Sequence, residues 1–190
     1  MKLRHYDHDS RARFVTCCTH RRIPLLSDDS INQIIVDTVF SVCRTQQIRL
    51  LAYVIMPEHV HLLIQPQGSD YDIAAILKAI KQPVARRAKR FLEEENPVWL
   101  KRLKVKSGNR EVFRFWQAGP GYDRNIRDEK EMSEKLQYIH NNPVKRGLAA
   151  RGEDWLWSSA GWYLDRRDAK ITMDGRTDKG WHGQTWFVRE

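Results

Sequence analysis

Residues 53–65 read Tyr53-Val-Ile-Met-Pro-Glu-His-Val-His-Leu-Leu-Ile-Gln65, an apolar run that breaks at Pro57 and resumes with two histidines. Strong β-formers flank the break, which predicts two antiparallel strands, at residues 50–56 and 59–65, joined by a very short turn. Side chains alternate along a strand, so His59 and His61 share one face while the apolar residues at 60, 62 and 64 take the other. The two histidines are expected about 7 Å apart along the strand, a spacing at which both imidazoles can bind one cation.

The histidine pair has two interpretations. A histidine on an apolar strand is commonly a hydrogen-bonded core residue, and paired imidazoles also bind metal ions in hydrolases and cupin-like sites. The spacing therefore makes His59 and His61 candidate metal ligands without naming the chemistry. That chemistry requires a nucleophile elsewhere in the chain.

Size and composition set the broad class. The chain has 190 residues and a mass of 22.5 kDa, which fits one domain with an extension. No apolar run approaches the roughly 18 residues of a membrane span, and the polar first residues lack the apolar region of a secretory signal. The three cysteines contain no Cys-x-x-Cys pair, which indicates reduced thiols. We expect a cytoplasmic, nucleoid-associated protein with no membrane partner.

The charge of the chain indicates its partner. A net charge of +9 and a pI of about 9.6 favour a polyanion, and nucleic acid is the commonest one. A basic run is often only a solvated helix face, but the overall excess of positive charge favours phosphate binding. Residues 96–111 are predicted to form a loop that could close over a strand of nucleic acid. The predicted DNA contacts on the helix before that loop are Arg86, Arg87, Lys89 and Arg90.

The remaining segments predict a β-α-β-β-α-β order around the central hairpin. Branched and aromatic residues predict a first strand at 13–19, and an N-cap at Asp28 or Asp29 opens a helix to about residue 45. A second helix is announced by residues 68–70, and Pro83 should kink or restart it. A last core strand is predicted at 112–117, before a turn at 119–121.

A later helix carries the candidate nucleophile. It is predicted to begin after Asp128 and to end near residue 141. Tyr138 lies roughly 120° from the middle of the apolar stripe of that helix. Asn142 shares the face of Tyr138 one turn later, and the following Pro143 places it at the helix end. An amide oxygen there suits a hard cation while the phenol stays free to attack. A surface tyrosine on an exposed face is the simpler interpretation.

Three motifs together resemble a known family. The first is the stretch 53–64 quoted above, and the others are Tyr138-Ile-His-Asn-Asn-Pro-Val-Lys-Arg-Gly-Leu148 and Trp155-Leu-Trp-Ser-Ser159. In this order and separation they resemble the signatures of single-tyrosine transposases, most closely the REP-associated tyrosine transposases. These belong to the HUH endonuclease superfamily, named for histidine, hydrophobic residue, histidine. The similarity covers roughly residues 11–165.

The resemblance implies a role for each matching residue. His59 and His61 correspond to the paired metal ligands, Asn142 to the third ligand and Tyr138 to the nucleophile. The implied fold is α+β, a ferredoxin-like antiparallel sheet with helices on one face and the active site on the other, plus a C-terminal extension. Many relatives carry a pattern like Asp-His-x-Ile-Arg before the tyrosine helix, whereas this chain has Asp123-Arg-Asn-Ile-Arg127. Any role of that histidine is not carried over.

The implied activity is metal-dependent nicking and joining of single-stranded hairpin DNA. It would use Mg²⁺ or Mn²⁺ and pass through a 5′-phosphotyrosine intermediate. Lys145 and Arg146, just past the tyrosine helix, are predicted phosphate contacts. Two other hypotheses stay open, a non-catalytic hairpin-binding protein and a metal-dependent RNA nuclease that uses water. The protein is expected to be a monomer or a homodimer.

The C-terminal region is the least informative part of the sequence. We expect the transposase-like domain to span residues 1–164 and residues 165–190 to form a partly disordered tail. Tryptophans near this end either stack on bases or, more commonly, pack a C-terminal segment. They are Trp155, Trp157, Trp162, Trp181 and Trp186.

Overall fold

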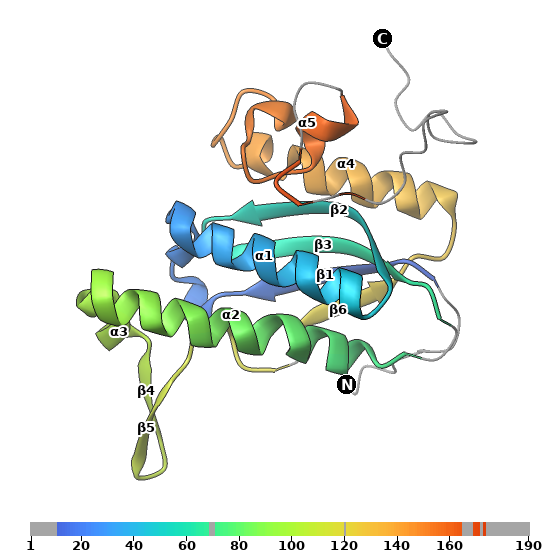
Figure 1. Cartoon of the computed structure of the whole chain (residues 1–190). Helices are drawn as coiled ribbons and strands as arrows, with labels where there is room; N and C mark the ends of the chain where they lie inside the picture. Colours follow the sequence, from blue (N-terminus) through green and yellow to red (C-terminus); the bar gives the residue numbers. More distant parts are fainter. Residues whose placement is uncertain (1–10, 69–70, 120, 165–168, 172, 174–190) are drawn as a thin grey trace.

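A computed structural model describes residues 11–68, 71–119, 121–164, 169–171 and 173 of the chain (Figure 1). Its main elements are β1 (Arg13–Cys18), α1 (Asp29–Thr45), β2 (Ile48–Met56), β3 (His59–Pro66), α2 (Ile73–Glu95), α3 (Pro97–Arg102), β4 (Lys104–Ser107), β5 (Arg110–Phe113), β6 (Tyr122–Asn125), α4 (Glu129–Lys145) and α5 (Ala160–Tyr163). Short 3₁₀ turns lie at His20–Arg22, Leu25–Ser27 and Gly152–Asp154.

The central sheet contains four antiparallel strands in the order β2-β3-β1-β6. Strand β3 lies between β2 and β1, so the sheet begins with a split β-α-β unit, as in a ferredoxin-like fold. The predicted strands on both sides of Pro57 are confirmed, and only two residues join them. In the register of the sheet His61 is paired with Thr16 of β1 and with Val54 of β2. The pair of histidines therefore lies in the middle of the sheet.

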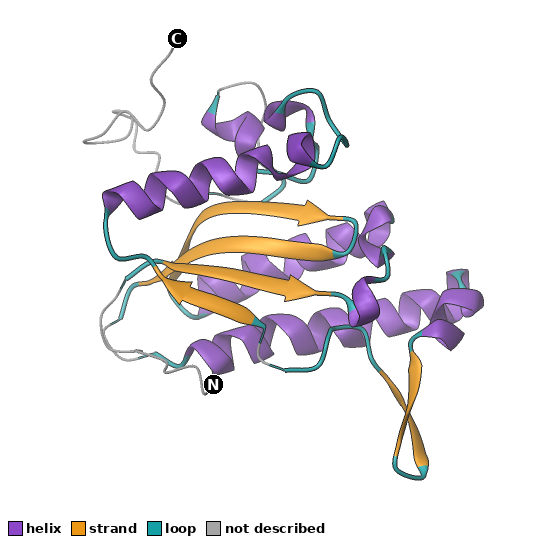
Figure 2. Cartoon of the chain, turned by 180° about the vertical axis from the view of Figure 1, so that it is seen from behind, coloured by secondary structure: helices purple, strands orange, loops and turns teal. Residues whose placement is uncertain are grey.

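The two faces of the sheet are covered by different helices (Figures 1 and 2). Helices α1 and α2 pack on one face, where Val60 and Leu62 enter the larger apolar cluster. Helix α4 lies on the opposite face, where its Leu136 and Ile139 pack with Leu63 of β3. The predicted α+β sheet with its helices is confirmed, with the addition that the face of the histidines is itself partly covered by α4.

The predicted fourth strand at residues 112–117 is wrong. Strand β5 ends at Phe113 and pairs only with β4, in a separate two-stranded hairpin that projects from the body of the molecule (Figure 1). The edge strand of the main sheet is β6, which pairs with β1. Trp116 contributes only an isolated bridge to Thr19. The loop predicted at residues 96–111 is also wrong, because this segment forms α3, β4 and the start of β5.

Two helices continue through a proline. Helix α2 begins after Asp72, whose side chain accepts hydrogen bonds from the next turn, and runs past Pro83 without restarting. Helix α4 is capped by Asp128, which accepts a hydrogen bond from the backbone of Glu131 at 2.8 Å. It continues through Pro143 to Lys145, so the predicted end near residue 141 is wrong. An interior proline removes one helical hydrogen bond, and here the packing of the apolar face outweighs that cost.

The segment after α4 packs onto the sheet. The indole nitrogen of Trp155 donates to the carbonyl of Ile55 at 2.9 Å, and that of Trp157 donates to Asp29 at 2.7 Å. Ile171 is buried against the larger apolar cluster. Trp155 and Trp157 therefore pack this segment onto the sheet. Trp181 and Trp186 lie outside the described residues. The division at residue 164 stays a prediction. Within the described ranges, no helix is both long and apolar enough to cross a membrane.

Candidate active site

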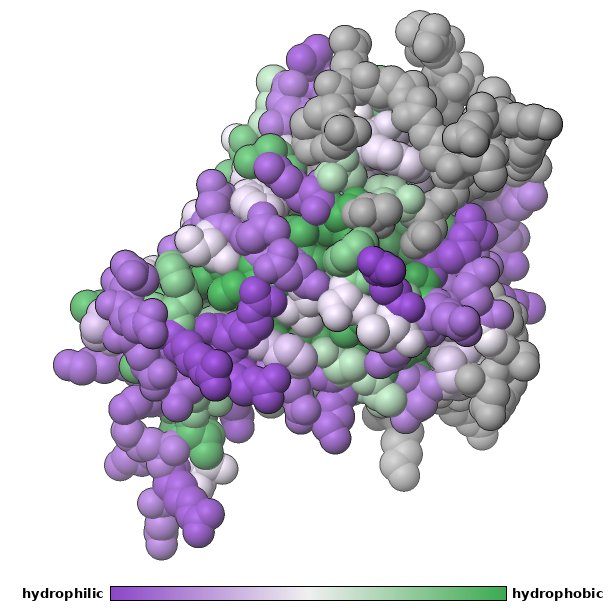
Figure 3. All heavy atoms as spheres, viewed as in Figure 1, coloured by the Kyte–Doolittle hydropathy of each residue, from purple (hydrophilic) through white to green (hydrophobic). Residues whose placement is uncertain are grey.

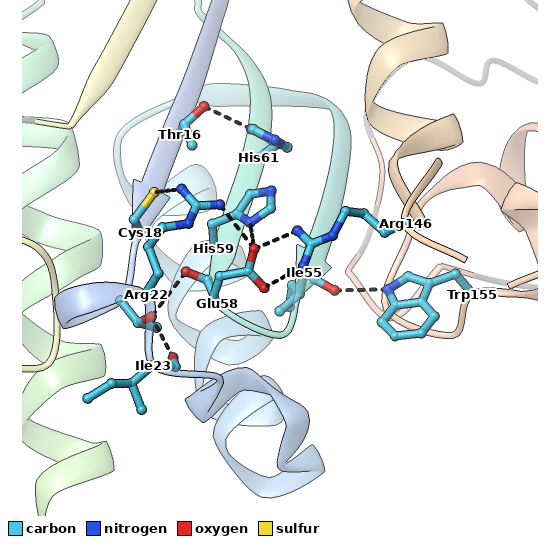
Figure 4. A network of polar contacts seen from close by, with 11 residues as sticks. Thr16, Cys18, Arg22, Ile23, Ile55, Glu58, His59, His61, Arg146 and Trp155 are labelled. Carbon is cyan, nitrogen blue, oxygen red and sulfur yellow. Dashed lines mark hydrogen bonds and ion pairs between the residues drawn. The ribbon is translucent and has the colours of Figure 1, made fainter. Parts of the chain in front are cut away.

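The two histidines of β3 are held with one ring nitrogen each engaged (Figure 4). Their ring centroids are 4.5 Å apart, and both side chains are buried. The Nδ1 atom of His61 lies 2.8 Å from the hydroxyl of Thr16, and Nδ1 of His59 lies 3.0 Å from a carboxylate oxygen of Glu58. The Nε2 atom of His61 is buried and has no hydrogen-bond partner among the described residues. Anchoring Nδ1 in this way leaves Nε2 to bind a ligand.

Burial favours the neutral form of both imidazoles. It lowers the pKa of His61 to about 3, with the neighbouring His59 adding to the effect. Burial also lowers the pKa of His59, although the charge of Glu58 opposes this. For Glu58 burial alone would raise the pKa, but hydrogen bonds from Arg146 and His59, together with the charge of Arg146, bring it down to about 2. Neutral imidazoles are the form that binds metal ions.

Helix α4 brings Tyr138 and Asn142 to the histidines. The ring of Tyr138 is 5.3 Å from that of His61 and 5.8 Å from that of Phe14. Its side chain is 38 % exposed, whereas Asn142 is buried. The ammonium groups of Lys135 and Lys145 lie 5.7 Å and 5.6 Å from the centre of the phenol ring. The predicted nucleophile is therefore accessible and has positive charge beside it.

These side chains line one open pocket of about 540 Å³. Strands β1, β3 and β6, the turn after β1 and helix α4 all contribute to it. Its lining residues are Phe14, Thr16, Arg22, His59, His61, Tyr122, Lys135, Tyr138, Asn142 and Arg146. The four predicted site residues thus lie together, on the side of the sheet opposite α1 and α2.

Sequence reasoning missed Thr16, Arg22 and Glu58. Thr16 is the cross-strand neighbour of His61, so the register of β1 with β3 would have found it. Glu58 stands inside the histidine motif, in the two-residue turn between the two strands. Nothing in the local sequence of Arg22 points to the site, since its position depends on how the turn after β1 packs.

The predicted DNA contacts fall into two groups. Arg86, Arg87, Lys89 and Arg90 lie on α2, across the sheet from the histidines, and hydrophilic side chains cover this end of the molecule (Figure 3). Arg87 pairs with Asp37 at 2.9 Å, and Lys89 pairs with Glu93 at 3.4 Å. Lys145 and Arg146 instead lie at the end of α4 beside the pocket. Only this second group is close to the candidate nucleophile.

Arg124 of β6 pairs with a residue of the tyrosine helix. Its Nε atom lies 2.6 Å from a carboxylate oxygen of Glu131, and Nε of Arg127 lies 3.1 Å from the other oxygen. Glu131 is buried near the start of α4. The arginine therefore ties β6 to the helix that carries Tyr138.

Comparison with known proteins identifies the family of the chain. A protein from Haemophilus influenzae, whose name places it among the REP-associated tyrosine transposases, is 30 % identical over 117 residues. The match covers 62 % of this chain, which spans only 61 % of that relative. The REP-associated tyrosine transposase of Escherichia coli is 26 % identical over 149 residues, covering 77 % of this chain and 73 % of its own length.

A solved structure of a REP-associated tyrosine transposase bound to a REP hairpin has the same fold. It matches with a TM-score of 0.67 and 21 % identity, over 97 % of this chain and 99 % of the other. The model of the family described as "Transposase IS200 like" matches residues 8–142, well over half of the chain. The resemblance inferred from the three motifs is confirmed, and the chain belongs to the IS200-like transposase family.

Proposed function

We propose that the protein nicks and joins single-stranded DNA beside a REP-like hairpin, with Tyr138 as the nucleophile and a divalent cation as cofactor. Membership of a transposase family and the hairpin named for the structural relative support the substrate class. The observation that carries the proposal is the shared pocket, in which the exposed phenol of Tyr138 lies against the ring of His61. A backbone phosphate entering this pocket would meet the phenol and the imidazoles together.

The residues at the pocket fit a hard divalent cation. His61 offers a buried Nε2 atom without a protein partner, His59 lies beside it, and Asn142 adds an amide oxygen. The candidate donors are therefore two imidazoles and one amide. We infer Mg²⁺ or Mn²⁺. When bound, such a cation polarises a phosphate oxygen and stabilises the leaving 3′-oxygen.

The phenol oxygen of Tyr138 is the atom that attacks. A new bond forms between this oxygen and phosphorus, the bond from phosphorus to the 3′-oxygen breaks, and the phenol proton passes to solvent while the 3′-oxygen takes one up. The products are a 5′-phosphotyrosine and a free 3′-hydroxyl. Because the phosphodiester is conserved as a covalent link, the 3′-hydroxyl of a second DNA end can reverse the step without ATP.

Positive side chains at the rim of the pocket complement the DNA backbone. Lys135 and Lys145 flank the phenol, and Arg146 lines the pocket at the end of α4. Contacts of this kind hold a phosphate in position but do not read its sequence. They support a nucleic-acid substrate whose backbone phosphate reaches Tyr138.

The test is covalent trapping with a matched tyrosine control. End-labelled hairpin DNA with a single-stranded extension is incubated with the protein and Mn²⁺, and a denaturant-resistant adduct is looked for on a gel. We expect Tyr138→Phe to abolish the adduct. Tyr122→Phe should retain it, although Tyr122 is an exposed phenol in the same pocket.

Other outcomes assign a different function. Cleavage that survives Tyr138→Phe without any adduct would point to water as the nucleophile, and the same assay with RNA tests the nuclease alternative. Binding of the hairpin DNA without cleavage, with each divalent cation tested, would support a hairpin-binding protein. An adduct that maps to Tyr122 by peptide sequencing would overturn the assignment of the nucleophile.

A further inference from the structure

We propose that Glu58 is a positioning residue that assembles a phosphate-binding subsite from two arginines, Arg22 and Arg146, next to His59. The proposal rests on the proposed function, because the phosphate is that of the DNA strand reaching Tyr138. In this proposal Arg22 contacts the DNA, and the buried carboxylate of Glu58 holds the two arginines in place.

Three segments meet at the carboxylate of Glu58 (Figure 4). Its Oε1 atom lies 3.0 Å from Arg22 in the turn after β1, 2.7 Å from Arg146 at the end of α4, and 3.0 Å from Nδ1 of His59. A second nitrogen of Arg146 is 3.5 Å from Oε2. The carboxylate itself is buried, so it serves as a fixed centre around which these side chains are arranged.

The turn that carries Arg22 has a strained backbone. Arg21 and Arg22 both have φ of 53°, a left-handed conformation that residues other than glycine rarely adopt. The turn is tied to the hairpin next to it, since the backbone nitrogen of Thr19 donates to the carbonyl of Glu58 at 3.0 Å. Strain of this kind persists where the surrounding structure holds it, and it is concentrated at functional sites. Here the strained turn brings the Arg22 side chain within hydrogen-bond distance of Glu58.

The arginines keep donors available for a ligand. A guanidinium has five N–H donors, and Glu58 occupies one from Arg22 and two from Arg146. The two side chains are 58 % and 46 % exposed, and both line the pocket that contains Tyr138. One carboxylate between two guanidiniums leaves one net positive charge, which matches the single negative charge of a phosphodiester. Two pre-arranged guanidiniums can bind its two non-bridging oxygens.

The same carboxylate orients His59. Because Glu58 accepts a hydrogen bond at Nδ1, that nitrogen carries the proton and Nε2 is the one left for the pocket. Glu58 therefore acts on the phosphate side and on the imidazole side at once. Replacing Glu58 should therefore weaken phosphate binding and also change the tautomer of His59. Loss of an ion pair with a purely structural role would change neither.

The first experiment compares Arg22→Gly with Arg21→Gly. Both variants remove one positive charge and relieve the same left-handed strain, but Arg21 does not line the pocket. Affinity for the labelled hairpin DNA is measured by fluorescence anisotropy in EDTA, where no cleavage occurs, at several salt concentrations. We expect Arg22→Gly to bind about tenfold more weakly and to lower the salt slope by about one, with Arg21→Gly close to wild type.

The second experiment tests the positioning role through Glu58→Gln. The tautomer of His59, followed by ¹⁵N NMR, should shift from protonation at Nδ1 alone towards a mixture. In the Glu58→Gln background Arg22→Gly should cost much less affinity than in wild type, because the arginine is already released. This double-mutant cycle separates positioning from general destabilisation.

The outcomes separate this proposal from the one it rests on. Equal affinity of Arg22→Gly and Arg21→Gly, with the adduct still formed, would overturn the subsite and leave Tyr138 as the nucleophile. An unchanged His59 tautomer together with an undiminished Arg22 effect in Glu58→Gln would overturn the role of Glu58. If wild type binds no hairpin DNA, both proposals fail.

Discussion

The two faces of the central sheet use the same strands for different purposes. On the face under α1 and α2, Val60 and Leu62 are buried in a continuous apolar cluster. On the other face, α4 seals only part of the sheet with Leu136 and Ile139, and beyond them the histidines of β3 line an open pocket. Along β3, the candidate ligands His59 and His61 thus alternate with the core residues Val60 and Leu62.

Packing on the core face helps to hold the polar site on the other face at fixed geometry. Buried polar groups are costly unless they are hydrogen-bonded, and His61 has its Nδ1 satisfied by Thr16 while Nε2 is left open. The strand cannot shift to improve that bond, because a slip of one residue would expose Leu62. Packing on one face therefore fixes the imidazoles on the other.

The largest expected effect is on the core face. Leu62→Ala should lower the free energy of unfolding by about 3 kcal/mol, because it leaves a cavity under α1 and α2. Leu62→Met, which conserves volume, should cost less than about 1.5 kcal/mol. Both are measured by urea denaturation. A free energy of unfolding for Leu62→Ala within about 0.5 kcal/mol of wild type would contradict the assignment of Leu62 to the packed core.

The next effect is on the site face. His61→Ala should reduce Mn²⁺ affinity at least about 100-fold, since disturbing residues behind a ligand already costs 10- to 100-fold. Thr16→Val, which removes only the hydroxyl at Nδ1 of His61, should reduce it about tenfold. Titration calorimetry measures both. Binding by His61→Ala at wild-type strength would refute the assignment of the ligand.

The smallest effect compares two adjacent cysteines of β1. Cys17 faces the apolar cluster, and burial raises its pKa to about 11, so its thiol stays protonated at pH 8. Cys18 is half-buried on the side of His59, its partner in the sheet. Iodoacetamide at pH 8 should therefore modify Cys18 at least about tenfold faster than Cys17, as read by tandem mass spectrometry. Cys18→Ser should abolish the fast phase, and equal rates would contradict the assigned faces.

Much of the fold could be predicted from local patterns. Alternation assigned the faces of β3 correctly, and the capping aspartates located the starts of α1 and α4. The edge strand β6 could not be found, because its sequence Tyr122-Asp-Arg-Asn125 is polar and becomes a strand only by pairing with β1. Residues 112–117 contain stronger β-formers, yet only their first two belong to a strand, and that strand pairs with β4. Tertiary context overrode propensity in both places.

The residues of the candidate site that belong to a short sequence motif could be predicted. His59, His61, Tyr138 and Asn142 were all named from the sequence, and the structure brings them to one pocket. The partners that orient them come from elsewhere in the chain, as with Arg22, and no short-range pattern records such a contact. The basic residues of α2 were singled out by charge alone, which carries no information about which side of the sheet they occupy.

The β4–β5 hairpin is a suitable place to attach a label. Its tip at Gly108 has open space around the position of an added Cβ, while φ of 59° is the left-handed conformation that favours glycine, so Gly108 itself should be kept. Exposed tips of this kind tolerate insertions well. A fluorophore or an affinity peptide inserted beside Gly108 would label the molecule outside the central sheet and the pocket.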